Sequence, residues 1–250
     1  MSLIDVNFDF TSDTKGYWNK YWDSDPILGC VNQDPDSASK TMQLYHKLLY
    51  SKPLPNGEIM DLKIGSGANY LTWKNFRFGS DSIIVSFRYK RYRNMIKQVA
   101  NSLTDYHEYM ENYIHKSYTL GGEIIFPKRM GGINQSRGCN QFIKDRWDLT
   151  LECIRRFYIN EESPLSDVLL QDKDFFDLFI DFKGYVDYFY LQDCVSSDYS
   201  KIIFWLGNGE FEPFPLPRTV KEYLQWIERE LEFVKMRNNR IRHATKEIVL

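Results

Sequence analysis

Segments with helical periodicity and segments with strand-like composition follow one another along this chain without a regular alternation. Apolar residues recur at helical spacing over 142–158, and also over 92–118 with a break near Ser102. Short runs rich in β-branched and aromatic residues predict strands at 58–64, 69–73, 82–87 and 121–127. A parallel α/β fold would alternate strands and helices regularly. The pattern therefore predicts an α+β fold, mainly helical, with a small antiparallel sheet.

The remaining elements follow from local patterns. Asp36 and Ser37 are candidate N-caps for a helix that runs to about Ser51, and a long final helix is expected from Val220. Shorter helices are expected within 163–170 and 174–193, and a further strand at 201–207. Aromatic residues make up 16% of the chain, so large rings should fill the core. One aromatic stripe is expected to be core: Phe175, Phe179, Phe182 and Phe189.

The chain of 250 residues fits a single domain. Residues 1–35 read as an irregular N-terminal arm with a short helix near 17–21, and residues 36–250 as one globular α+β domain. No internal repeat, low-complexity tract or flexible linker interrupts the sequence. We therefore expect one core rather than two.

Charge and cysteine usage favour a soluble cytoplasmic protein. The 32 basic and 34 acidic residues give a net charge of −2, which predicts no general attraction to nucleic acid or to an anionic membrane. No apolar run approaches the ~18 residues of a membrane span, and the first ten residues lack a signal-peptide pattern. The four cysteines form no CxxC pair, so we expect reduced thiols at 30, 139, 153 and 194.

The most distinctive run in the chain is INQSRG at 133–138, followed by DRWDLTLECIRR at 145–156. Together with LYHKLLYSKPLPNGEIMDL, SPLSDVL and DFKGYVDYFYLQD, this run resembles a family of uncharacterised bacterial proteins, described only as a domain of unknown function. The resemblance spans most of residues 40–215. It implies bacterial kinship and a cytoplasmic location, and it carries no activity or catalytic residue over to this chain.

The same polar segment is the first candidate site. A loop before a helix favours anions, and arginine forks can bind phosphate or carboxylate in bidentate fashion. On the helix, acidic and basic residues lie three to four positions apart, which also predicts structural ion pairs. The candidate ligand-binding residues are Asn134, Gln135, Arg137, Gly138, Asp145, Arg146, Asp148, Glu152 and Arg155.

Two basic segments are weaker candidates. Arg237 and His243 resemble the ribonuclease motif of HEPN-type helical nucleases, in which histidine handles a proton and arginine holds the phosphate. Basic residues with interleaved tyrosines over 88–97 could contact single-stranded nucleic acid; they include Arg88, Lys90, Arg91 and Arg93.

Common catalytic and cofactor motifs are absent. The sequence contains no HExxH or HxxxH pair, no complete dinucleotide-binding glycine motif, no phosphate-binding P-loop and no GxSxG element. We therefore expect no metal and no cofactor. The favoured interpretation is a protein whose polar segment 134–156 is structural or binds a partner. The alternatives are a binding module for a phosphorylated or carboxylated ligand at Arg137 and Arg146, and a ribonuclease-like defence or toxin protein that uses Arg237 and His243.

Overall fold

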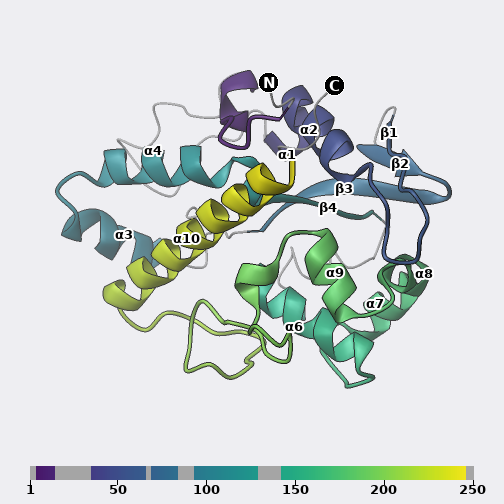
Figure 1. The fold of residues 1–250 in the computed structure, drawn as a ribbon. Coiled ribbons are helices and arrows are strands. Elements are labelled where there is room, and N and C mark those ends of the chain that lie inside the picture. The colour runs from purple at the N-terminus through teal and green to yellow at the C-terminus, as the bar shows by residue number, and fades with distance from the viewer. Residues whose placement is uncertain (1–3, 15–34, 66–68, 84–92, 129–141, 246–250) are drawn as a thin grey trace.

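A four-stranded antiparallel sheet lies at the centre of the fold (Figure 1). The computed structural model describes residues 4–14, 35–65, 69–83, 93–128 and 142–245. The strands are adjacent in chain order, and each pairs antiparallel with the next. Their bounds are Lys63–Ile64 (β1), Leu71–Trp73 (β2), Phe76–Ser82 (β3) and Glu123–Pro127 (β4). With helices making up most of the remaining structure, the α+β prediction is confirmed.

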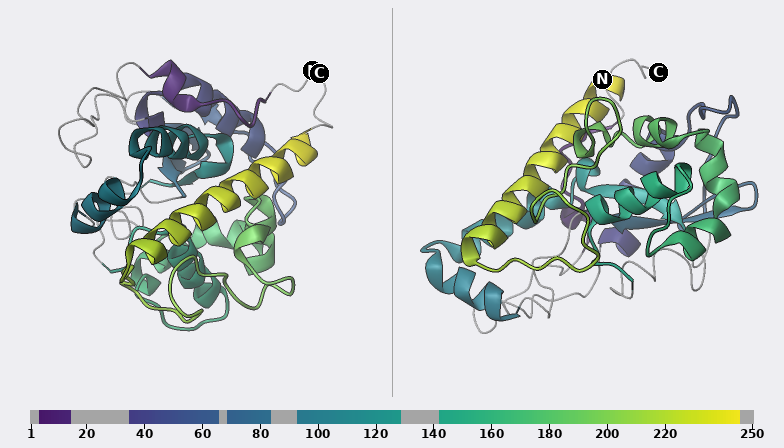
Figure 2. Two further views of the ribbon diagram at one scale, coloured as in Figure 1. Left: turned by 90° about the vertical axis from the view of Figure 1, so that its left-hand side faces the viewer. Right: turned by 90° about the horizontal axis from the view of Figure 1, so that it is seen from below.

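Helices cover both faces of the sheet. The first two helices and the N-terminal segment lie on one face, and the helices of residues 147–188 lie on the other (Figures 1 and 2). The α-helices are α1 (Pro35–Ala38), α2 (Lys40–Tyr50), α3 (Arg93–Ser102), α4 (Tyr106–Ser117), α6 (Trp147–Tyr158), α7 (Ser166–Gln171), α8 (Lys173–Phe176), α9 (Phe182–Tyr188) and α10 (Val220–Thr245). The 3-10 helices are η1 (Phe10–Asp13), η4 (Leu120–Gly122), η5 (Asp177–Phe179) and η6 (Gln192–Cys194).

Strand β4 is buried along its whole length because both of its faces are covered. The Phe126 ring meets the rings of Trp147 on α6 and Phe175 on α8, at centroid distances of 5.4 and 6.5 Å. The predicted aromatic stripe is confirmed as core, with Phe182 the most exposed of its four members at 6%. Large rings therefore join the sheet to the helices of the second layer.

The long helix α10 packs against three elements of the middle of the chain, η4, α4 and α3. Gly121 in η4 allows this close approach. A Cβ atom at that position would lie 2.3 Å from the carbonyl oxygen of Val234, which no side chain tolerates. The Gly121 amide instead donates to Asn238 Oδ1 at 2.6 Å. The glycine thus fixes the connection before β4 against the C-terminal helix.

Several element predictions need correction. Strand β3 begins at Phe76, before the expected strand at 82–87, and residues 84–87 of that expectation lie outside the described residues. The segment 201–207 forms only an isolated bridge, between Val195 and Ile202, because no neighbouring strand extends the pairing. Helix α6 begins at Trp147 rather than at residue 142. The expected helix near 17–21 also lies outside the described residues.

The start of α2 and the N-terminal segment differ from the sequence prediction, and each difference has a physical reason. The N-cap of α2 is Ser39, whose hydroxyl oxygen accepts a hydrogen bond from the Met42 amide at 3.0 Å. The described part of the N-terminal arm is packed rather than peripheral, since Ile4, Val6 and Phe10 are buried in the core. The division into an arm and one domain stays a prediction. Within the described residues, no helix is long and apolar enough to cross a membrane.

Candidate functional site

Arg146 and Asp148 form a buried ion pair at the start of α6. Both side chains are fully buried. Arg146 donates from Nε to Asp148 Oδ1 at 3.0 Å and from Nη2 to Oδ2, which is a bidentate arrangement. Asp148 also accepts from the amides of Leu149 and Trp205, at 3.0 and 2.9 Å. Because Asp148 already occupies the guanidinium fork, this pair ties α6 to the chain around Trp205.

A second set of charges lies along α6. Glu152 accepts hydrogen bonds from Arg155 and from Arg156, each with a shortest distance of 2.7 Å. Burial raises the pKa of Glu152, but the hydrogen bonds and charges of the two arginines outweigh burial and lower it overall. Asp145 is half-buried. The remaining candidates of this segment lie outside the described residues: Asn134, Gln135, Arg137 and Gly138.

Arg237 and His243 lie in different environments although both are on α10. His243 is exposed, whereas Arg237 is fully buried. Arg237 donates from Nε to the carbonyl of Phe189, from Nη2 to Tyr50 Oη and from Nη1 to the carbonyls of Leu120, Gly121 and Glu123, at 2.8–3.2 Å. A nuclease arginine must reach a phosphate, and this guanidinium is instead engaged inside the protein. The geometry therefore gives the ribonuclease interpretation no support.

The buried Arg237 charge changes the titration of its neighbours. His46 is fully buried, and its Nδ1 lies 3.0 Å from Tyr70 Oη. Burial first, and then the charge of Arg237, lower the pKa of His46 from 6.5 to about 3, although the Glu123 backbone opposes this in part. The same two causes lower the pKa of Lys52 from 10.5 to about 7. His46 is therefore neutral at physiological pH.

We expect the folded protein to lose stability as the pH falls below 6.5. In the unfolded chain His46 has a pKa of 6.5 and becomes protonated in this range, whereas in the folded protein its pKa is about 3 and it stays neutral. At pH 5 this loss amounts to about 2 kcal/mol. Urea unfolding at pH 7 and pH 5 measures this change in the free energy of unfolding, which should be larger in the wild type than in His46→Asn. The exposed His243→Asn variant serves as control and should keep the wild-type pH dependence. Equal pH dependence in wild type and His46→Asn would contradict the assignment.

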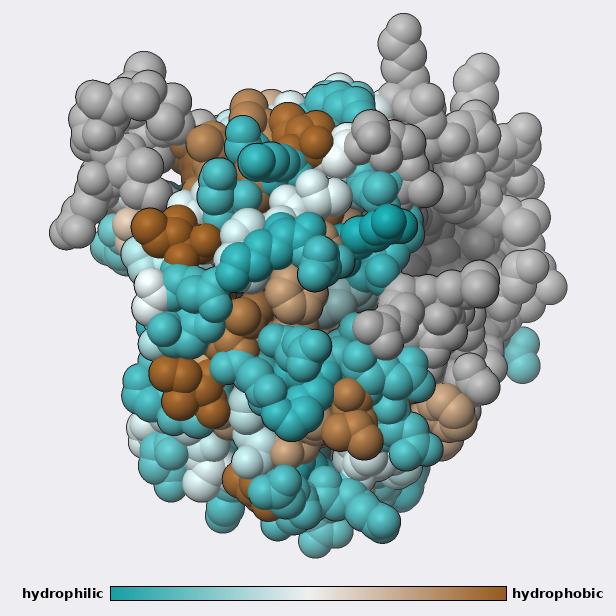
Figure 3. Space-filling model, turned by 90° about the vertical axis from the view of Figure 1, so that its right-hand side faces the viewer, coloured by the Kyte–Doolittle hydropathy of each residue, from teal (hydrophilic) through white to brown (hydrophobic). Residues whose placement is uncertain are grey.

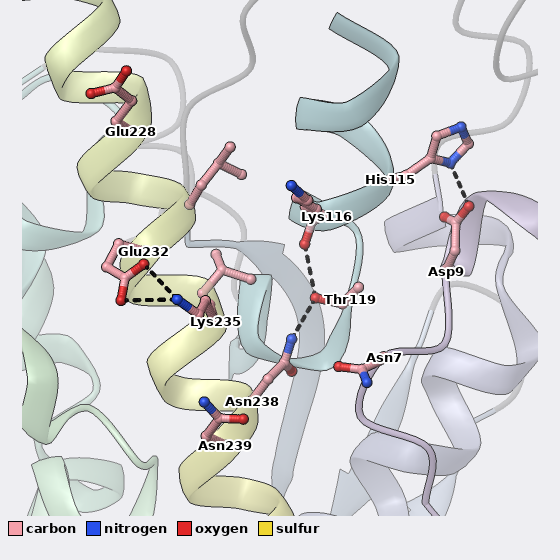
Figure 4. A pocket seen from close by; sticks show the side chains of 12 residues that line it. Asn7, Asp9, His115, Lys116, Thr119, Glu228, Glu232, Lys235, Asn238 and Asn239 are labelled. Carbon is pink, nitrogen blue, oxygen red and sulfur yellow. Dashed lines mark hydrogen bonds and ion pairs between the residues drawn. The ribbon is translucent and has the colours of Figure 1, made fainter. Parts of the chain in front are cut away.

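A groove lies between α10 and α4, with the N-terminal segment at one end (Figure 4). Its volume is about 670 Å³, which is within the range of small-molecule sites. In Figure 4, α10 forms the left wall, and His115, Lys116 and Asp9 lie on the right. Leu231 and Val234 contribute apolar surface from α10. This groove, which we call the α4–α10 groove, is the candidate functional site.

The floor of the α4–α10 groove is held by a chain of hydrogen bonds. Asn238 donates from Nδ2 to Thr119 Oγ1 at 2.8 Å, and Thr119 Oγ1 donates to the Lys116 carbonyl at 2.9 Å. Asn238 Oδ1 accepts from the Gly121 amide. Because each of these groups is oriented by another protein group, the floor is rigid before any ligand enters.

One rim of the groove is formed by an aspartate–histidine pair. His115 Nδ1 lies 2.5 Å from Asp9 Oδ2. The other carboxylate oxygen of Asp9 accepts from the amide and hydroxyl of Thr11, at 2.9 and 2.6 Å. Asp9 is thereby fixed as the N-cap of η1 while it orients His115 on α4. The pair ties the N-terminal segment to the wall of the groove.

The charges around the groove are only partly paired. Lys235 and Glu232 form an ion pair on α10 at 3.2 Å. Arg242 donates to Asn239 Oδ1 and to Asn7 Oδ1, at 2.6 and 3.0 Å, and so closes one end. Within the described ranges, no ion-pair partner is found for Lys116, Arg242 or Glu228. The lining therefore presents one cation, Lys116, and one anion, Glu228, that a ligand could neutralise, and the Arg242 charge lies behind Asn7 and Asn239 at one end.

A second cavity of about 380 Å³ lies between residues 205–218 and the start of α10. Its two arginines, Arg218 and Arg229, are accompanied by Glu212 and Glu222. Glu222 already accepts from the Arg218 amide at 2.6 Å, and Arg229 donates to the Trp205 carbonyl at 2.9 Å. The cavity is smaller and its charges balance, so it is the weaker candidate.

Other surface features do not add a site. The face in Figure 3 carries apolar residues in separate groups with hydrophilic residues between them, over the part that the described residues form. No cluster of histidine, cysteine or acidic residues able to hold a metal ion occurs in the described part of the chain. Cys153 and Cys194 are buried free thiols, and burial is the main cause that raises the pKa of both.

Sequence reasoning missed the α4–α10 groove. One signal was present, since Glu228, Leu231, Lys235 and Asn238 recur at helical spacing on the final helix. That spacing predicts that the four residues share one face of the helix, but it does not predict which other element packs beside that face. Asp9 and His115 are more than one hundred residues apart, so only the fold brings them together.

Comparisons with known proteins agree with the sequence resemblance. Searches of curated proteins and of solved structures return no match. The model of DUF6994, a family of unknown function, matches residues 4–241. The match covers nearly all of the chain, including every strand and the groove walls. The chain is therefore a member of the DUF6994 family of unknown function.

Proposed function

We propose that this protein is a binding module for a small organic anion, carboxylated or phosphorylated, in the α4–α10 groove. The observation that carries the proposal is a groove of about 670 Å³ with a rigid floor and a cation, Lys116, that has no ion-pair partner among the described residues. A pre-oriented site binds more tightly because little ordering remains to be done. Arg242 adds a second positive charge at the Asn7–Asn239 end.

This proposal takes the ligand class from the first alternative of the sequence analysis and assigns it to the α4–α10 groove instead of Arg137 and Arg146. Arg146 is buried against Asp148, which supports a structural role for the described part of segment 134–156. A bacterial and cytoplasmic setting is also proposed. Its support is the sequence resemblance and the two buried free thiols, which fit a reducing compartment.

Hexanoate and hexyl phosphate are suitable probes, because each combines an anionic group with a short apolar chain that suits Leu231 and Val234. We expect at least one of them to raise the thermal midpoint of the wild type, by mass action on the folded state. Lys116→Met should weaken that binding about tenfold in calorimetric titration.

The matched control is Lys201→Met, which removes an exposed lysine outside the groove. It should bind the probes as the wild type does. Binding that Lys116→Met leaves unchanged, or no binding of either probe, would contradict an anion site at this place.

A further inference from the structure

The two ends of the α4–α10 groove differ in charge. Glu228 lines it toward the start of α10, and no described residue forms an ion pair with this carboxylate. At the other end, Asn7 and Asn239 hold the Arg242 guanidinium through their amide oxygens. Arginine has no acceptor atom, so these amides must turn their oxygens toward it, and the positive charge is fixed there. Figure 4 shows Glu228 and Asn239 at opposite ends of the α10 wall.

The α10 helix sets the scale of this separation. Glu228 and Asn239 are eleven positions apart on one continuous helix. At a rise of 1.5 Å per residue, the two ends are about 16 Å apart along the helix axis. Between them, α10 offers Leu231 and Val234 to the groove, while Lys235 is occupied by Glu232. A ligand that follows the groove thus passes from Glu228 over apolar surface and past Lys116 to the end where Asn7 and Asn239 hold the Arg242 guanidinium.

We propose that the natural ligand is an elongated zwitterion, with an ammonium group at Glu228 and a carboxylate or phosphate toward Lys116 and Arg242. This inference rests on the proposed anion-binding function and adds the second charge and the orientation. Two opposite charges at the ends of a chain match the groove at both ends, whereas a simple anion leaves Glu228 unneutralised. An unpaired carboxylate beside an apolar ligand also loses hydration, which disfavours ligands without a cation.

The probes are ω-amino acids of increasing length, 4-aminobutanoate, 8-aminooctanoate and 12-aminododecanoate, each compared with the fatty acid of equal chain length. Calorimetric titration should show the 8- or 12-carbon amino acid binding about tenfold more tightly than its fatty acid. The 4-carbon member is too short to reach both ends and should gain nothing from its amine. Glu228→Gln should remove the advantage of the amine, and Glu210→Gln, an exposed glutamate away from the groove, should keep it.

The outcomes separate the two proposals. Octanoate binding that depends on Lys116 but equals 8-aminooctanoate binding overturns the zwitterion and leaves the anion site. An advantage of the amine that survives Glu228→Gln also overturns the assigned orientation. If neither series binds the wild type, the anion site and the zwitterion fail together. Circular dichroism of each variant confirms that these surface substitutions leave the fold unchanged.

Discussion

Replacing Arg237 with methionine should lower the free energy of unfolding by about 3–5 kcal/mol, because several buried acceptors each lose a hydrogen bond to a charged group, worth about 1.5–3 kcal/mol. The guanidinium is fully buried and bonds five acceptors from three separate parts of the chain. Methionine fills part of the volume but has no donor. The carbonyls of Leu120, Gly121 and Glu123 would each lose this donor inside the protein, at a cost of about 1–3 kcal/mol for any group left unsatisfied.

Arg237→Lys tests the geometry of this site. Lysine keeps the charge, but its compact ammonium cannot reach acceptors on opposite sides of a planar fork. We expect it to be destabilised nearly as much as the methionine variant. Arg240→Met, which removes a partly exposed pair with Asp193, is the matched control on the same helix and should lose about 1 kcal/mol or less. Urea unfolding measures all three. Similar losses for Arg237→Met and Arg240→Met would show that the buried network contributes little.

Replacing Arg146 with methionine should likewise cost about 3–5 kcal/mol, because it leaves the Asp148 carboxylate buried without its counter-charge. Among the described residues, Asp148 would keep the amide donors of Leu149 and Trp205. In the double variant with Asp148→Asn, the loss should be smaller than the sum of the two single losses, since no charge is then left unpaired.

The control for Arg146 is Arg155→Met, whose side chain is partly exposed and which shares Glu152 with Arg156. Phosphate should not stabilise the wild type through Arg146, because Asp148 already fills the fork. Anion-dependent stabilisation that Arg146→Met removes, together with little loss of stability in that variant, would mean that a ligand site lies here after all.

Local signals were enough to predict part of this fold. Helix α10 and strand β4 follow from periodicity and from β-branched composition, and the aromatic stripe was recognisable as core. Strand β3 was not predictable, because Gly79, Ser80 and Asp81 are poor strand formers. It is a strand because β2 pairs with one of its edges and β4 with the other.

For the polar residues too, contacts between neighbours in the sequence were predictable and contacts between distant residues were not. Charges spaced along 145–156 led us to expect ion pairs, and such pairs are present at Arg146 and at Glu152. The same reasoning offered Arg237 as a residue that holds a phosphate, since nothing near it in sequence provides its acceptors. The groove could not be predicted for the same reason, because its lining comes from the N-terminal segment, from the end of α4 and from α10, which are far apart in the sequence.

The contacts of Arg237 also constrain how this protein can be completed during synthesis. The carbonyls of Leu120, Gly121 and Glu123 are made roughly midway along the chain, and the guanidinium that joins them lies on α10. Until α10 emerges from the ribosome, these carbonyls lack the Arg237 donor and α10 does not yet cover them, so the middle of the chain cannot reach its final packing. A nascent chain that stops before residue 237 should therefore depend on chaperones, and the last helix acts as the step that commits the whole molecule to its native state.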